Sequence, residues 1–182
     1  MNYQSKTFDA LLVLEYRSGN SKALELLVKK YHIKLCKHAY WFTLDMDSSQ
    51  DIVQDSWKSI LSSLPTLKEP ERFGSWVFTI VTRKSLDYIK KQKRGKYELH
   101  QYGLLIDTDI HDPSTDNQVV LLKKAILTLP RNQQLVLRLF YTEGYSLNEI
   151  HGILDISVGT VKSRLFHARE KLKRILKQKQ HE

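Results

Sequence analysis

The chain has few of the features that would mark an enzyme or a metal protein. It has a single cysteine, Cys36, which excludes an intrachain disulfide framework and a cysteine-rich zinc site. Its seven histidines show no metal-ligand spacing such as HExxH. No nucleophile, base and orienting group can be recognised together. We therefore expect a protein that is not an enzyme and that needs neither a metal nor a cofactor.

Long apolar runs are missing as well. No segment reaches the roughly 18–20 apolar residues that a membrane-spanning helix needs. The N-terminal sequence MNYQSKTFDA lacks the charged-then-apolar form of a signal peptide. These absences predict a soluble protein of a reducing cytoplasm, with no membrane partner.

The apolar–polar alternation that is typical of strands is absent, and helical spacing prevails. Cys36 falls at helical spacing among apolar residues, so packing is its expected role. In the first half of the chain, the predicted helices begin at about Phe8, Ser21, Ser48 and Glu71, with Ser48 and Asp51 as a cap pair. The buried face predicted for the fourth of them consists of Trp76, Val77, Ile80, Val81, Leu86 and Ile89.

Residues 93–117 interrupt the helical pattern. They contain Gly95, Gly103, Pro113 and scattered aspartates, without a sustained apolar period. Loops of this length are uncommon inside one compact domain. We therefore expect an all-α chain of two small helical domains, each with about four helices. These would be residues 1–92 and 118–182, joined by a flexible linker at 93–117.

The formal net charge is +9, and the basic excess is concentrated at one end. Residues 118–182 carry 12 Lys and Arg against 5 Asp and Glu, whereas residues 1–92 carry 14 against 10. Such concentration indicates a polyanionic partner. Charge alone does not choose between DNA, RNA and an anionic membrane surface.

Residues 146–174 carry the most informative pattern, two helices joined by a tight turn. Ser146 and Glu149 have capping-box spacing, and an apolar stripe follows until a turn near Asp155. Ser157 is a second N-cap. Such a pair can place its second helix in the major groove of DNA. Its predicted buried face is Val161, Leu165, Ala168, Leu172, Ile175 and Leu176.

The other sides of this second helix are polar and basic. Arginine can fork onto guanine acceptors, while Ser, Thr and Lys suit phosphate or base contacts. An amphipathic hairpin with a merely solvated basic face is the alternative that the pattern alone leaves open. The candidate DNA-binding residues are Ser157, Val158, Gly159, Thr160, Lys162, Ser163, Arg164, His167 and Arg169.

Three segments together resemble one known family. They are DIVQDSW at residues 51–57, FGSWVFTIVTRKSLDYIKKQKR at 73–94, and the stretch from LPRNQQ to AREKL at 129–172. In this order and at these separations they are similar to the bacterial RNA polymerase sigma factors of the sigma-70 family, in its minimal extracytoplasmic-function (ECF) group. The absence of a third domain and of an acidic N-terminal region points to the minimal group.

The resemblance implies a dissociable initiation subunit whose partners are core RNA polymerase and promoter DNA in a bacterial cytoplasm. Residues 1–92 would be region 2 and residues 118–182 would be region 4, which reads the −35 element. Asp51, Gln54 and Asp55, at i, i+3 and i+4 on one helix face, would bind the polymerase. An anti-sigma factor is a candidate partner because such inhibitors are common in the group.

The resemblance also implies that the fourth helix and the loop before it face the −10 element. In relatives this loop captures a flipped base of the opened strand, which needs a pocket and a few polar groups. Basic residues of the helix would neutralise the DNA backbone. Trp76 fits the buried period better than a stacking role. The implied −10 residues are Thr66, Lys68, Phe73, Trp76, Arg83, Lys84, Lys90 and Lys91.

The chain departs from the family pattern at several positions. His151 replaces a small residue and has to tilt outward or widen the helix pair. Asp155 replaces a turn glycine, but aspartate tolerates the left-handed conformation better than most residues. Lys84 stands where Asn is usual, and Gln134 where Arg is usual. Two other functions stay open: a stand-alone dimeric helix-turn-helix regulator, and a helical RNA-binding or scaffold protein.

Overall fold

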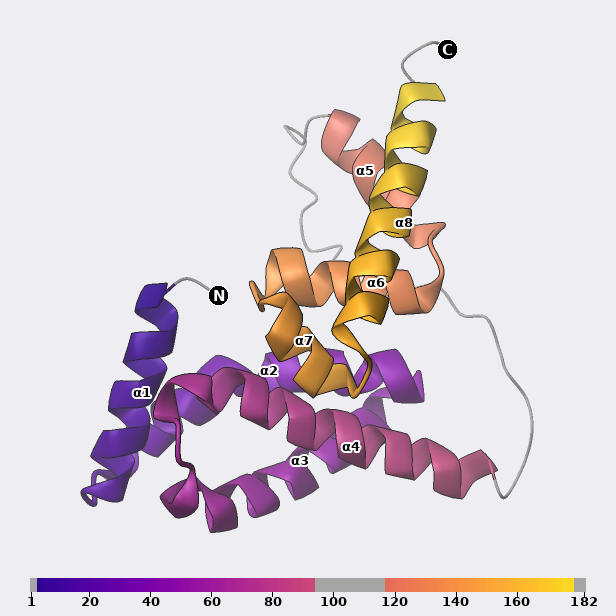
Figure 1. Cartoon of the computed structure of the whole chain (residues 1–182). Helices are drawn as coiled ribbons and strands as arrows, with labels where there is room; N and C mark the ends of the chain where they lie inside the picture. The colour runs from indigo at the N-terminus through magenta and orange to yellow at the C-terminus, as the bar shows by residue number, and fades with distance from the viewer. Residues whose placement is uncertain (1–2, 94–116, 179–182) are drawn as a thin grey trace. The chain divides into compact units, whose positions relative to one another are not determined.

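The computed structural model describes residues 3–93 and 117–178, and every regular element in these two ranges is helical (Figure 1). The prediction of an all-α chain is confirmed. The contacts divide the chain into two compact units. For description we name the two described ranges by their place in the chain: residues 3–93, with α1 to α4, are the N-terminal unit, and residues 117–178, with α5 to α8, are the C-terminal unit. The predicted linker, apart from its two end residues, lies outside the described residues.

The N-terminal unit is a bundle in which α2 packs against each of the other three long helices. Its core is apolar, with Leu27, Leu35, Ile60 and Phe78 fully buried. Cys36 is buried in α2, as its spacing predicted. The elements are α1 (Tyr3–Arg17), α2 (Ser21–Thr43), α3 (Met46–Ser63), the 3₁₀ turns η1 (Leu64–Thr66) and η2 (Pro70–Arg72), and α4 (Phe73–Lys93).

The start of α3 differs from the prediction. Its N-cap is Asp45, whose carboxylate accepts a hydrogen bond from the Ser48 amide at 2.7 Å. The hydroxyl of Ser48 instead pairs with that of Tyr88 in α4, at 2.6 Å. The predicted cap pair of Ser48 and Asp51 is therefore wrong. Aspartate and serine are both strong N-cap residues, and the sequence places them close together here.

The buried face of α4 was predicted only in part. Val77 and Val81 are fully buried as expected, but Trp76, Ile80, Leu86 and Ile89 are half-buried. Because α4 packs against both α2 and α3, its buried face is rotated from the predicted one. The residues that complete it are Phe73, Phe78, Thr82 and Ser85.

Two buried polar contacts tie the helices of this unit together. Asp9 in α1 has no exposed surface, and its carboxylate accepts from the Tyr31 hydroxyl at 2.6 Å and from Lys30 Nζ at 2.5 Å. His38 in α2 is also fully buried, with Nε2 at 2.8 Å from Thr82 Oγ1 in α4. Burying such groups is tolerated when hydrogen bonds replace those to water. These contacts therefore fix how α1 and α4 lie on α2.

The C-terminal unit begins with two helices that pack against the long last helix. Buried Gln134 in α6 donates through Nε2 to the carbonyls of Leu127 and Leu129, at 3.3 and 2.6 Å, and so holds the end of α5. The elements are α5 (Asn117–Leu127), α6 (Arg131–Leu137), the π-helical turn η3 (Arg138–Thr142), α7 (Leu147–Leu154) and α8 (Val158–Gln178).

The predicted buried face of α8 is confirmed in its first half, where Val161, Leu165 and Ala168 are buried. Leu172, Ile175 and Leu176, further along, are half-buried rather than buried. None of the helices in the described part of the chain has the length and apolarity needed to cross a bilayer.

Candidate nucleic-acid interface

Side-chain caps fix both helices of the helix–turn–helix formed by α7 and α8. Ser146 Oγ accepts from the Glu149 amide at 3.3 Å, while the Glu149 carboxylate accepts from the Ser146 amide at 2.9 Å. This is the predicted capping box. At the start of α8, Ser157 Oγ accepts from the Thr160 amide at 3.0 Å, which confirms the second N-cap.

The turn between the two helices contains Asp155 in the left-handed conformation, with a φ of 53°. This conformation is costly for most residues other than glycine, and aspartate is among those that tolerate it best. Asp155 can therefore stand where the family usually has glycine. His151 is exposed on α7, so it tilts outward, the first of its two predicted outcomes.

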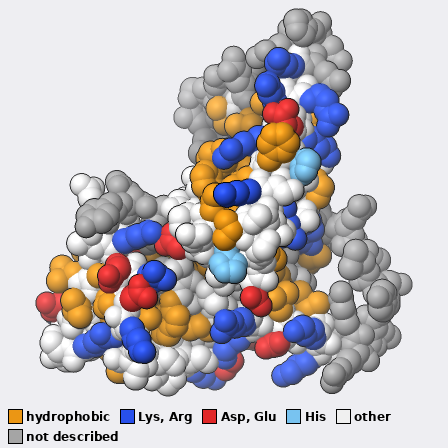
Figure 2. Space-filling view, viewed as in Figure 1, with side chains coloured by type: hydrophobic (Ala, Val, Ile, Leu, Met, Phe, Trp, Pro, Cys, Tyr) orange, Lys and Arg blue, Asp and Glu red, His pale blue; other side chains and the backbone are white. Residues whose placement is uncertain are grey.

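The exposed side of α8 is polar and basic near its N-terminus. Figure 2 shows Lys and Arg side chains gathered along this helix, whereas acidic and basic side chains are interspersed over the N-terminal unit. None of the predicted −35 residues is buried. Val158, Thr160 and Arg164 are half-buried, and the exposed ones are Ser157, Gly159, Lys162, Ser163, His167 and Arg169.

Two aromatic features of this surface were not predicted from the sequence. Phe166 is 60 % exposed and follows Lys162 and Ser163 at helical spacing, so it shares their face of α8. Its ring lies 5.5 Å from that of His167. Arg169 lies over the rings of Phe140 and Tyr141 in η3, at 5.7 and 5.5 Å from their centroids. Arg169 thus combines exposure with a cation–π contact.

In the N-terminal unit, Asp51, Gln54 and Asp55 are all exposed on α3, as their spacing predicted. Lys84 of α4 reaches this acidic face. Its ammonium group pairs with the Asp55 carboxylate and also donates to the Asp55 carbonyl at 3.2 Å. The hydrogen bond from Lys84, and next its charge, hold the pKa of Asp55 below its ordinary value. Lys84 therefore already forms an ion pair within the protein.

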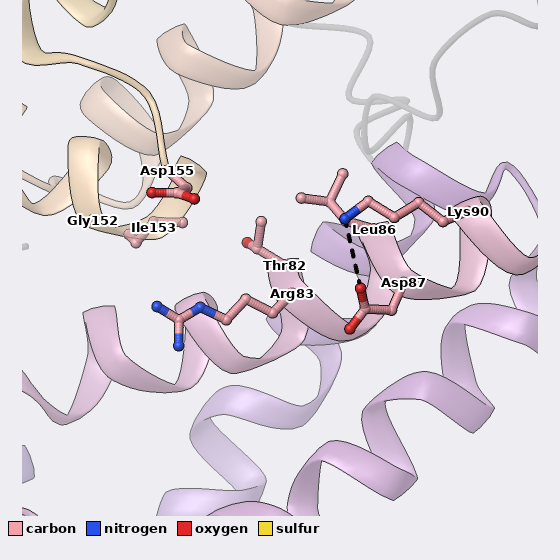
Figure 3. A pocket seen from close by; sticks show the side chains of 8 residues that line it. All are labelled: Thr82, Arg83, Leu86, Asp87, Lys90, Gly152, Ile153 and Asp155. Atoms are coloured by element: carbon pink, nitrogen blue, oxygen red, sulfur yellow. Dashed lines mark ion pairs between the residues drawn. The ribbon is translucent and has the colours of Figure 1, made fainter.

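The other basic residues predicted on α4 are exposed. Figure 3 shows Arg83 extended from the helix and Lys90 directed toward Asp87, 3.8 Å away. Lys91 is exposed as well. Phe73 behaves differently: it has no exposed surface, and its ring stacks edge-on against Tyr31, with 5.4 Å between centroids. Phe73 therefore has no surface to offer to DNA.

The loop between α3 and α4 exposes Thr66 and Lys68. The Thr66 hydroxyl donates to the Ser63 carbonyl at 2.9 Å, which makes the turn compact. From the end of α1, the guanidinium of Arg17 donates to the carbonyl of Leu64 at 3.0 Å and to that of Leu67. No feature of the sequence pointed to this contact. No cluster of metal-ligating residues occurs in ranges 3–93 and 117–178.

Family models match both halves of the chain. The sigma-70 region 2 model matches residues 27–95, and the sigma-70 region 4 model matches residues 120–172.

Several curated proteins are similar along most of their length. RNA polymerase sigma factor SigV of Bacillus subtilis is 32 % identical over 130 residues, covering 71 % of this chain and 76 % of SigV. The ECF sigma factor SigW of the same organism is 25 % identical and covers 91 % of this chain and 95 % of SigW. The sigma-E factor of Haemophilus influenzae is 26 % identical, at 89 % and 92 % coverage.

Two solved structures share the fold. CnrH, in complex with the cytosolic domain of CnrY, matches with a TM-score of 0.59 and 24 % identity, over 94 % of this chain and 98 % of CnrH. The sigma factor RpoE of Bartonella quintana, in complex with the anti-sigma factor NepR, matches with a TM-score of 0.61 and 22 % identity, over 86 % and 98 %.

Proposed function

The chain belongs to the ECF group of sigma-70 family RNA polymerase sigma factors, and we propose on this premise that it is a dissociable initiation subunit. It binds core RNA polymerase and directs transcription from promoters with −35 and −10 elements. Residues 1–92 act as region 2 and residues 118–182 as region 4. The site of action is the bacterial cytoplasm.

The capped start of α8 supports the −35 contact most directly. The Ser157 cap fixes the first turn of the helix, where base edges are reached in helix–turn–helix complexes. Three polar side chains near this end of α8 are exposed: Lys162, Ser163 and His167. Arg164, beside them, is half-buried. Arg164 is the candidate for a bidentate contact to guanine.

Region 2 provides two further surfaces. The exposed acids Asp51 and Asp55, with Gln54 between them, form a surface suited to a basic or hydrogen-bonding partner, and we assign it to core polymerase. For the −10 element we assign Thr66 and Lys68 of the loop together with the exposed basic residues of α4, which are Arg83, Lys90 and Lys91. Lys84 joins these two surfaces through its pair with Asp55.

Promoter opening by such a protein needs no covalent chemistry. Unstacking and unpairing a base costs a few kcal/mol, which binding of the exposed base can offset. The protein thus acts through binding energy and positioning rather than as an enzyme. Because one structural relative is seen with an anti-sigma factor, we also propose that an inhibitor of this kind controls the chain.

Reconstitution tests the function. The protein is mixed with bacterial core polymerase, and transcription starts are mapped over a whole genome. New starts that share a two-box element are expected. Their absence would refute the proposal, and tight operator binding by the protein alone would favour a dimeric helix-turn-helix regulator. Equal binding to arbitrary RNA and DNA with a steep salt dependence would favour a generic nucleic-acid-binding protein.

One variant tests the role of α8. Arg164→Ala is expected to weaken −35-dependent transcription by roughly tenfold, as loss of one bidentate base contact would. Core binding is expected to be unchanged. Arg174→Ala, an exposed arginine near the other end of α8, is the matched control. Loss of core binding by Arg164→Ala would instead mean that the assignment of this helix to the −35 element is wrong.

A further inference from the structure

No residue of helix α1 has been assigned to a polymerase or DNA contact so far. The match to region 2 begins at residue 27, and α1 ends at Arg17. The side chain of Arg17 nevertheless makes hydrogen bonds across a long sequence separation to residues 64–72, the loop assigned to the −10 element. We define this segment as the promoter loop.

The contact is a fork of donors onto two backbone carbonyls. Nη2 of Arg17 donates to the Leu64 carbonyl at 3.0 Å and also to the Leu67 carbonyl, and Nε lies 3.4 Å from the Leu64 carbonyl. These carbonyls stand at the two ends of the η1 turn. A guanidinium holds its donors in one rigid plane. The separation and orientation of the two carbonyls are thereby fixed together.

The remaining hydrogen bonds of the promoter loop, as far as the described residues show, are local. Thr66 bonds to Ser63, the Leu67 amide bonds to the Leu64 carbonyl at 3.3 Å, and Glu69 pairs with Arg72 at 2.7 Å. Such bonds shape short turns, and packing of η2 on α1 and of η1 on α3 holds these turns to the bundle. Leu64 is fully buried and anchors one end. Through its hydrogen bond to the Leu67 carbonyl, Arg17 also attaches the other end of the η1 turn, next to exposed Lys68.

Helix α1 is itself firmly attached, so it can serve as a support. Its Asp9 is buried and bonded to both Tyr31 and Lys30 of α2. Lys30 also donates to Ser5 Oγ at 2.9 Å. These bonds fix the rotation and the height of α1 on α2. The backbone of Arg17, in the last turn of the same helix, is therefore held in a fixed position from which its side chain contacts the loop.

We propose that Arg17 is a positioning residue for promoter opening, which holds the promoter loop ready to receive an unstacked base of the −10 strand. The inference rests on the function proposed above. Arg17 acts through the carbonyls of Leu64 and Leu67, and Thr66 and Lys68 meet the DNA. A preformed loop spares the ordering that a mobile loop would undergo on binding. Lysine, a single point of charge, cannot hold both carbonyls in one plane.

The test uses the full chain in holoenzyme with core polymerase. Arg17→Ala and Arg17→Lys are compared with Lys22→Ala, an exposed residue at the start of α2 as the control. Four quantities are measured: affinity for core, the melting temperature, the rate of promoter opening from a fluorescent base in the −10 element, and affinity for single-stranded −10 DNA. The affinity for single-stranded −10 DNA is measured again with an abasic site at each position in turn. If the loop captures a base, the affinity should fall when that base is missing.

We expect Arg17→Ala to open the promoter about tenfold more slowly, as loss of a charge-assisted contact would produce. It is also expected to lose most of the preference for the intact strand over the abasic strand. Arg17→Lys should fall between alanine and wild type. Core affinity should match that of Lys22→Ala, which should behave as wild type, whereas the melting temperature of Arg17→Ala should fall, because the lost hydrogen bonds also stabilise the fold.

If the wild-type chain initiates transcription with core polymerase, the sigma function stands, and either of two results would then overturn the proposal for Arg17. The first is wild-type opening and an unchanged abasic ratio for Arg17→Ala. The second is a parallel fall of core affinity and opening in both Arg17 variants with an unchanged abasic ratio, which would make Arg17 a structural residue only. If the wild-type chain fails to initiate with core, the proposed function fails, and this inference fails with it.

Discussion

Replacing Tyr31 by phenylalanine is expected to weaken the attachment of α1 to α2. The hydroxyl donates to the fully buried Asp9 carboxylate at 2.6 Å, and the tyrosine is only 1 % exposed. Phenylalanine keeps the ring and its edge-on contact with Phe73 but leaves Asp9 one hydrogen bond short. A hydrogen bond to a charged group contributes about 1.5–3 kcal/mol. We expect the free energy of unfolding to fall by about that amount.

Tryptophan fluorescence makes the measurement specific to the N-terminal unit, because the three tryptophans of the chain are Trp41, Trp57 and Trp76. Urea unfolding is followed for Tyr31→Phe, Asp9→Asn and the double variant. The double variant should be less destabilised than the two single changes added together, because both changes weaken or remove the same hydrogen bond. Tyr141→Phe, in the other unit, is the control. A change below about 0.5 kcal/mol for Tyr31→Phe would refute the reasoning, because surface substitutions have effects of that size.

Three further perturbations test other parts of the structure. Ser157→Ala removes the cap of α8 and is expected to lower the stability of the C-terminal unit by about 1 kcal/mol, read from thermal unfolding by circular dichroism; an unchanged melt would contradict the cap. Phe73→Ala leaves a cavity in the core and is expected to cost about 3–5 kcal/mol by tryptophan fluorescence, whereas normal stability with lost promoter binding would contradict its core role. Lys84→Met is expected to raise the pKa of Asp55, measured from its carboxyl carbon by NMR, because the hydrogen bond and charge that lower it are lost. Since the folded-state pKa is the lower one, the stabilisation by this pair is present above the unfolded pKa of about 3.9 and disappears as the pH falls through the folded value; an unchanged pKa would show that the pair does not form in solution.

Local signals in the sequence were reliable where one residue has one partner nearby. The capping box of Ser146 and Glu149 and the cap at Ser157 formed as predicted, since their partners lie three residues away. The αL turn at Asp155 followed from the same kind of rule. At α3, two cap-forming residues stand close together, and the choice of Asp45 over Ser48 depended on Tyr88, which is distant in sequence.

Periodicity identified α4 but not the orientation of its buried face. Several apolar residues lie around this helix, and only its packing against α2 and α3 decided that Phe78 is fully buried while Trp76 and Ile80 remain half-exposed. The same limit applies to the candidate site. The family motif placed Phe73 among the DNA contacts, but the structure buries it against Tyr31.

Contacts between distant polar groups left no trace in the sequence. Arg17 bonds to main-chain carbonyls, and every residue has such a carbonyl, so no pairing of residue types could have pointed to it. The pair of Lys84 and Asp55 joins two residues that the sequence assigned to two different partners. Such contacts become visible only when the fold brings the helices together.

The position of Cys36 decides whether this protein can itself sense oxidants. Oxidants react with thiolates, and a useful sensor thiol is both accessible and acidic. Cys36 is 8 % exposed, and burial raises the pKa of its thiol. It is also the only cysteine in the sequence, so no second thiol of the chain can trap an oxidised intermediate. A redox stimulus would therefore have to be detected by another molecule and delivered to this one by binding.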